Sequence, residues 1–101
     1  MQAGEVVEQV VEEIEELVGR TRFEHISCIE LIIGSGWNVE AEEVETLFEA
    51  YFDAHSNAVL RSAYVEVTIV SSGDTFPAPG RDDMQTANGY EVLITNIRGR
   101  N

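Results

Sequence analysis

The fold is decided by the stretch HISCIELIIGSG, residues 25–36, which joins a strand to the turn that ends it. Its side chains alternate between two faces with the period of two that a β-strand requires. The face better suited to a core consists of Ser27, Ile29, Leu31 and Ile33. The opposite face consists of Ile26, Cys28, Glu30 and Ile32. The two glycines of the GSG sequence then break the strand, so we predict a strand over His25–Ile33 with one apolar face toward a core.

Two amphipathic helices are predicted on either side of this strand, over Glu5–Val18 and Glu40–Ala54. In both, apolar residues recur at three- and four-residue spacing and form a single stripe. Glutamates occupy most of the positions between them, so each helix has one apolar face and one acidic face. The first helix is rich in valine, which is a weak helix former, and we therefore expect tertiary packing to hold it.

The second half of the chain contains two further predicted strands, over Ala63–Val70 and Tyr90–Ile97. Between them, Ser71–Gly89 holds both prolines and three of the eight glycines, which predicts a long, flexible loop. The last four residues are expected to fray. The order helix, strand, helix, strand, strand predicts a single α+β domain over residues 1–101, with two layers in which two helices cover one face of a three-stranded sheet.

The chain is strongly acidic, with 19 Asp and Glu residues against six Arg and no Lys, for a formal net charge of −13. Nucleic acid and anionic membrane surfaces are poor partners for it, because phosphate binding needs clustered Lys and Arg. A cationic protein surface would be attracted, although solubility or a salt-adapted or arginine-biased proteome also explains the acidity. No apolar run approaches the ~20 residues that span a bilayer, and the acidic N-terminus lacks the basic start of a signal peptide, so we expect a cytoplasmic protein.

Residues with metal-binding or catalytic chemistry are sparse. Cys28 is the one cysteine, so the chain forms no intrachain disulfide and no cysteine-based zinc site, and no cationic neighbour in sequence would stabilise its thiolate. His25 and His55 are the two histidines and the weak candidates for a metal site, against the commoner case of surface histidines at the ends of elements. The glutamate runs are interpreted as solvated helix faces rather than paired catalytic carboxylates. We therefore expect neither an enzyme nor a bound cofactor.

Several segments outside the loop follow one another in a familiar order and spacing. They are EQVVEEIEE (8–16), IELIIG (29–34), NVEAE (38–42), LFE (47–49), LRSAYVEV (60–67) and GYEVLI (89–94). Together they resemble the hydrogenase nickel-incorporation family (HypA/HybF). The resemblance implies a metallochaperone that hands nickel to the large subunit of [NiFe]-hydrogenase or to the urease apparatus, beside a nucleotide-hydrolysing partner.

The chain departs from that family at both of its metal sites. The family begins Met-His-Glu and binds nickel there, whereas Gln2 and Ala3 occupy these positions here. The family also carries two Cys-x-x-Cys pairs on a zinc lobe before the last strand, where this chain has the loop 71–89 without Cys or His. Neither an amide nor a methyl group replaces an imidazole as a nickel ligand. We therefore expect a relative that keeps the scaffold, replaces the zinc lobe by a loop and has lost the family's nickel and zinc sites.

The expected function is that of an accessory protein that assists [NiFe]-hydrogenase maturation or assembly through protein contacts. Its partners would then be hydrogenase maturation factors or the hydrogenase large subunit. The alternative is a metal-independent interaction module, or a small structural subunit, unrelated to nickel delivery.

The sheet face away from the helices is the predicted contact surface. Strand alternation assigns to it the apolar residues Ile26, Ile32, Tyr64, Val70 and Leu93. An open sheet with that much apolar surface usually has a partner, either another protein or a second copy of the chain. Ordinary mixed surface is the alternative, because isolated exposed apolar residues are common.

Overall fold

The computed structural model describes residues 2–20, 23–54, 58–61, 63–78 and 83–100. Within these ranges the elements follow in the order α1 (Ala3–Arg20), β1 (His25–Gly34), the 3-10 helix η1 (Ser35–Trp37), α2 (Ala41–Ala54), β2 (Tyr64–Val70), β3 (Thr75–Pro77), β4 (Met84–Thr86) and β5 (Val92–Arg100). The predicted helices and the first two predicted strands are confirmed to within two residues at each end.

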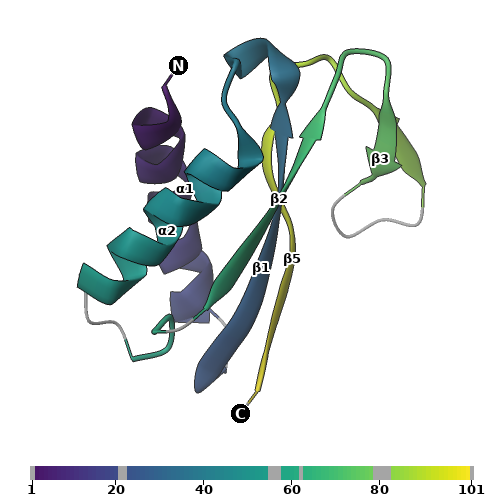
Figure 1. Ribbon diagram of the computed structural model, residues 1–101. Helices are drawn as coiled ribbons and strands as arrows, with labels where there is room; N and C mark the ends of the chain where they lie inside the picture. Colours follow the sequence, from purple (N-terminus) through teal and green to yellow (C-terminus); the bar gives the residue numbers. More distant parts are fainter. Residues whose placement is uncertain (1, 21–22, 55–57, 62, 79–82, 101) are drawn as a thin grey trace.

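β1 lies in the middle of a three-stranded sheet of order β2-β1-β5, parallel to β2 and antiparallel to β5. Parallel strands need a crossover connection, and α2 supplies it between β1 and β2. Both helices lie on the same face of the sheet, with α2 against β2 (Figure 1). The predicted α+β arrangement of two helices and a three-stranded sheet is therefore confirmed.

The main core lies between the helices and the inner face, which is the sheet face turned toward them. Its fully buried side chains come from both helices and from the predicted core face of β1, and include Val6, Val10, Ile14, Val44, Phe48, Ile29, Leu31 and Ile33. Each such side chain contributes roughly 1.5–3 kcal/mol on burial. This packing offsets the weak intrinsic helix preference of the valines in α1.

β5 continues to Arg100, so the expectation that the last four residues fray is wrong for 98–100. Arg98 pairs with Cys28 and Gly99 with Ile26. β5 therefore pairs with β1 from His25 to Ile33. A side chain at Gly99 would meet the backbone carbonyl of His25 and the ring of Phe23, which explains a glycine within a strand.

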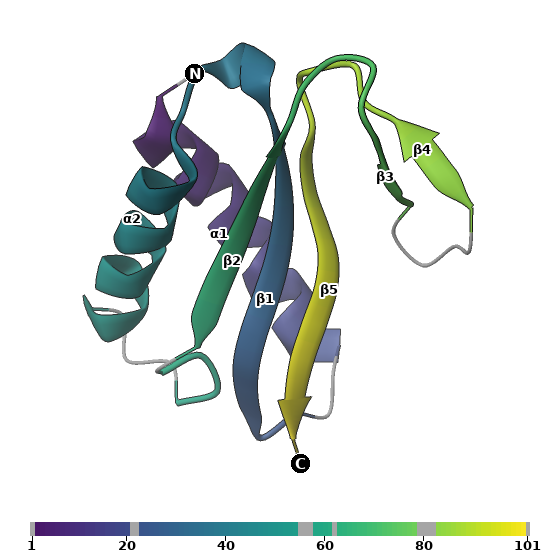
Figure 2. The ribbon, with the colours of Figure 1, turned by 45° about the vertical axis from the view of Figure 1, so that its right-hand side comes forward.

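Residues 71–89, predicted as a loop, contain a second, two-stranded sheet in which β3 pairs with β4. Backbone hydrogen bonds from Gly73 to Ala87 (2.9 Å) and from Ala87 to Asp74 (2.7 Å) close its base. The ribbon leaves one end of the main sheet and bends back on the side away from the helices (Figures 1 and 2). We call the described part of residues 71–89 the hairpin. Its strands were not predicted because, at three residues each, they are too short to show alternation. The flexibility of this segment stays a prediction.

The GSG sequence (residues 34–36) packs against the turn that precedes β5. Gly34 donates to the carbonyl of Glu91 at 2.8 Å, and Gly36 donates to that of Gly89 at 2.7 Å. A Cβ atom at Gly34 would overlap the backbone of Gly89, so glycine is required there. The buried carboxylate of Glu91 accepts the backbone N–H groups of Asn88 (2.7 Å) and Gly89 (3.0 Å), which fixes the turn.

Candidate functional site

The sheet face away from the helices, here called the outer face, is divided into two halves. At the hairpin end, Ile32 and Val70 are buried and Leu93 is half-buried, and all three pack with Phe76 and Ala87 of the hairpin region. We call this the covered half. The expectation that these three residues form an open apolar surface is therefore not met, because the chain covers them with its own hairpin.

Ile26 does not lie on the outer face at all. It is fully buried in the main core, and its backbone N–H donates to the carbonyl of Val59 at 2.9 Å. The pairing of β1 with β5 is shifted between Ile26 and Cys28, and such an irregularity breaks the strict alternation of side chains. The assignment of Ile26 to the outer face from a period of two fails for this reason.

Tyr64 is the predicted surface residue that stays exposed, with 51% of its area accessible. It pairs with Cys28 of β1, which in turn pairs with Arg98 of β5, so the three residues form one row across the sheet. The next row contains Glu66 and Glu30. These five residues, none of which is buried, define the open half of the outer face.

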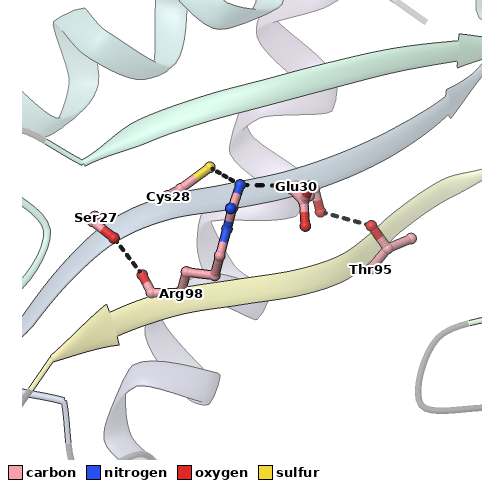
Figure 3. Close-up of polar contacts among 5 residues, drawn as sticks. All are labelled: Ser27, Cys28, Glu30, Thr95 and Arg98. Atoms are coloured by element: carbon pink, nitrogen blue, oxygen red, sulfur yellow. Dashed lines mark hydrogen bonds and ion pairs between the residues drawn. The ribbon is translucent and has the colours of Figure 1, made fainter.

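Arg98 contacts two side chains of the open half, those of Cys28 and Glu30 (Figure 3). Its Nη2 atom donates to Sγ of Cys28 at 3.5 Å and lies 3.7 Å from Oε1 of Glu30. The hydrogen bond to Cys28 raises the pKa of Arg98, and the charges of Cys28 and Glu30 act in the same direction. Because all these groups are solvent-accessible, the contacts position the guanidinium group more than they stabilise the fold.

Two hydrogen bonds from side-chain hydroxyl groups to backbone carbonyl groups join β1 and β5 next to Arg98. The hydroxyl of Ser27 donates to the carbonyl of Arg98 at 3.2 Å, and the hydroxyl of Thr95 donates to the carbonyl of Glu30 at 3.3 Å (Figure 3). The sequence gives Cys28 no cationic neighbour, but the fold brings one to it from 70 residues away. The role of Arg98 was missed because its segment was expected to fray.

Carboxylates follow the free edge of β2. Glu45, Glu49 and Asp53 are spaced four residues apart along α2 and therefore share one side of the helix. Oε2 of Glu45 accepts the backbone N–H of Val67 at 3.3 Å, which satisfies an edge group of β2. The spacing is readable in the sequence, where Glu45 and Glu49 belong to the acidic face of the predicted helix and Asp53 was given no role.

The phenol of Tyr64 lies within the field of two of these carboxylates, Glu45 and Glu49. Glu45 makes the largest contribution to the raised pKa of Tyr64, followed by desolvation and then by Glu66, Cys28 and Glu49. A negative field disfavours the phenolate and so extends to higher pH the range over which the hydroxyl group remains a donor.

A cleft of about 370 Å³ opens beside Tyr64 at the start of β2. It is lined by Glu49, Phe52, Asp53, Ala63 and Tyr64. Phe52 and Ala63 are buried and form an apolar base, while the two carboxylates and the phenol supply polar groups. A second hollow, of about 330 Å³, lies at the N-terminal end of α2 and is lined by Glu40, Glu42, Glu43, Thr46 and Leu47, with no aromatic side chain.

The far end of the molecule holds a third hollow, of about 500 Å³, beside Trp37 and the start of α1. Trp37 packs edge-on against Tyr90 with ring centroids 5.2 Å apart, and none of the described residues forms a hydrogen bond with its buried indole N–H. Trp37 is half-buried and packs against the main core, as a lid would.

The two histidines give no metal centre in the described part of the chain. His25 is half-buried at the start of β1, and His55 lies outside the described residues. Among residues 2–20, 23–54, 58–61, 63–78 and 83–100, no three His, Cys, Asp or Glu side chains are grouped so that they could hold a metal ion.

None of the described helices is both long enough and apolar enough to cross a membrane. Comparison of the chain with known protein families, with characterised proteins and with solved structures found no match. The site must therefore be interpreted from its own chemistry.

Proposed function

We propose that this chain is a non-catalytic protein-interaction domain of the cytoplasm and that the open half of the outer face is its contact surface. The observation that carries the proposal is Tyr64, a large aromatic side chain that is half exposed in the same row of the sheet as Arg98, with Cys28 between them. Tyrosine and arginine are the residue types that dominate binding energy at protein interfaces.

The surroundings of Tyr64 support the same role. Arg98 and Glu30 offer charges of both signs on a flat sheet surface, and both strands beneath them are held by hydrogen bonds. A preorganised surface loses little conformational entropy when a partner binds. If two copies of the chain associate, we expect the open half to mediate that contact, because the covered half is already packed.

For the biological role we propose an accessory protein of the HypA type that assists [NiFe]-hydrogenase maturation or assembly without carrying metal. The resemblance of the sequence segments supports this, together with the hairpin, which lies between β2 and β5 where the family carries its zinc lobe. The second candidate is a metal-independent interaction module or structural subunit. It is favoured by Gln2 and Ala3 at the positions of the family's nickel ligands.

Affinity purification of the tagged chain from its native host tests both levels of the proposal. We expect Tyr64→Ala to lose the partner that the wild-type chain retains, because it removes the exposed aromatic side chain of the open half without disturbing the core. Tyr90→Ala is the matched control, since Tyr90 is 60% exposed at the other end of the molecule. A partner that binds both variants equally would contradict the assignment of the surface.

The identity of the partner separates the two roles. A hydrogenase large subunit or maturation factor, identified by mass spectrometry, would support the HypA-type role. A stable stoichiometric complex with unrelated subunits would overturn it in favour of the structural alternative.

A further inference from the structure

The carboxylates along the edge of β2 belong to α2, and their mutual repulsion destabilises that helix. Like charges four residues apart destabilise a helix by roughly 0.2–0.5 kcal/mol per pair, and Glu45, Glu49 and Asp53 form two such pairs. Glu45 is engaged with the β2 backbone. Within the described residues, Glu49 and Asp53 take part in no ion pair, so their negative charge is uncompensated.

Those two carboxylates face a cleft with an aromatic lining. The cleft beside Tyr64, here called the β2 cleft, combines Glu49 and Asp53 with the exposed ring of Tyr64 and the apolar base formed by Phe52 and Ala63. Its volume of about 370 Å³ is enough for a long side chain. An aromatic wall beside paired carboxylates is the chemistry that binds an organic cation.

We propose that the β2 cleft binds the guanidinium group of an arginine side chain on the partner protein. The inference rests on the proposed function, because Tyr64 belongs to both the cleft and the open half. A guanidinium group is planar, stacks on an aromatic ring and donates several hydrogen bonds in a fixed fork, so it can contact Tyr64 and both carboxylates at once. A lysine ammonium group is a compact point charge and cannot make these contacts together.

The charge of the whole chain favours the same occupant. At a net charge of −13, the protein attracts a cationic surface and steers it in. Long-range attraction acts toward every acidic face of the protein. The ring of Tyr64 distinguishes the β2 cleft from the other acidic surfaces. The hollow beside Glu42 and Glu43 on the same helix has carboxylates without an aromatic side chain and provides an internal comparison.

A titration of the ¹⁵N-labelled chain, followed by NMR, tests the proposal with N-acetyl-arginine amide as the probe. We expect saturable shifts at millimolar concentration, centred on residues 49, 53, 63 and 64. N-acetyl-citrulline amide, which has nearly the same shape without the charge, should give none, and N-acetyl-lysine amide should bind more weakly. Equal shifts with lysine or citrulline, or equal shifts around Glu42 and Glu43, would overturn the proposal.

Substitutions give a second test. Tyr64→Ala should weaken arginine amide binding roughly three- to fivefold, as expected for a cation on an exposed aromatic ring. Glu49→Gln with Asp53→Asn should weaken it roughly tenfold through the loss of two ion pairs. The matched control, Glu42→Gln with Glu43→Gln, removes the same charge from the same helix and should leave binding within twofold. If both charge variants weaken binding equally, the cleft is not specific and the proposal fails.

The native partner distinguishes this inference from the proposed function. If the partner is lost by Tyr64→Ala but retained by Glu49→Gln with Asp53→Asn, the open half is the contact surface and the arginine assignment is wrong. If arginine amide binds in the cleft but no partner depends on Tyr64, the cleft stands as a cation site and the proposed function fails. Loss of the partner with both variants, and not with the control, supports both.

Discussion

The two halves of the outer face lie on the same three strands but differ in what covers them. In the covered half, Ile32 and Val70 are packed beneath Phe76 of the hairpin. In the open half, Tyr64 and Arg98 are exposed and lie among carboxylates. The chain has thus buried the apolar part of the face by itself and left the polar and aromatic part accessible.

This difference indicates what kind of partner the face can accept. A large exposed apolar patch would favour a permanent, hydrophobic interface. With that patch covered, the remaining surface offers one aromatic ring, one arginine and several carboxylates. Such a surface is suited to a partner of complementary charge, with specificity set by a few contacts.

The largest expected effect comes from Ile32→Glu, which places a carboxylate under the hairpin. Ile32 is 7% exposed and is surrounded by apolar side chains. An unpaired buried charge destabilises a protein by several kcal/mol, so we expect the free energy of unfolding to fall by about 3–5 kcal/mol in urea denaturation.

Thr68→Glu is the control for that substitution. Thr68 pairs with Ile32 across the sheet but is exposed, so the same new charge should change the free energy of unfolding by less than about 1 kcal/mol. Wild-type stability of Ile32→Glu would mean that the hairpin does not cover this half in solution. The sequence alone placed Ile32 on an open contact surface, where a new charge would not disturb the core.

Alternation and helical spacing were sufficient to predict the main layers. The stripes of both helices and the core face of β1 depend on local periodicity, and Ile29, Leu31 and Ile33 lie in the core as that period requires. The local pattern fails at Ile26, which is buried in the core, and at Ser27, which was assigned to the core face and is exposed, because a shift in strand pairing between Ile26 and Cys28 interrupts the period. Such a shift depends on the partner strand and leaves no mark on the sequence of β1.

The parts that could not be predicted depend on contacts between distant residues. Phe76 and Ile32 are 44 residues apart, and no short-range pattern indicates that one covers the other. The pairing of Arg98 with Cys28 likewise needs the full length of β5 against β1. The four-residue spacing of Glu45, Glu49 and Asp53 can be read from the sequence. The cleft also needs the ring of Tyr64, which β2 supplies through the fold.

Phe76→Ala should have the next largest effect, because it removes the main side chain that fixes the hairpin to the sheet. Phe76 is 3% exposed, and large-to-small substitutions of buried phenylalanine reduce stability by about 3–5 kcal/mol. We expect a loss of about 3 kcal/mol, at the lower end, since the cluster around it is small.

Met84→Ala is the matched control on the opposite strand of the hairpin. Met84 is 58% exposed, and its truncation should change stability by no more than about 0.5 kcal/mol. Circular dichroism during thermal unfolding measures both variants. Equal losses from the two substitutions would mean that burial of Phe76 does not hold the hairpin in place.

Glu45→Gln should have the smallest effect on the fold and the most specific effect on the open half. The amide oxygen of glutamine can still accept the N–H of Val67, so the edge of β2 keeps its hydrogen bond. The negative charge that contributes most to the raised pKa of Tyr64 is lost, and the phenolate then forms more easily. The pKa of Tyr64 should therefore fall toward its ordinary value in an ultraviolet titration, with Tyr64→Phe identifying its signal.

The pKa of Tyr51, raised first by desolvation and then by Glu15, should not move. Because both groups are accessible to solvent, high salt should narrow the difference between wild type and variant. An unchanged pKa of Tyr64 would mean that Glu45 does not create the field at this phenol.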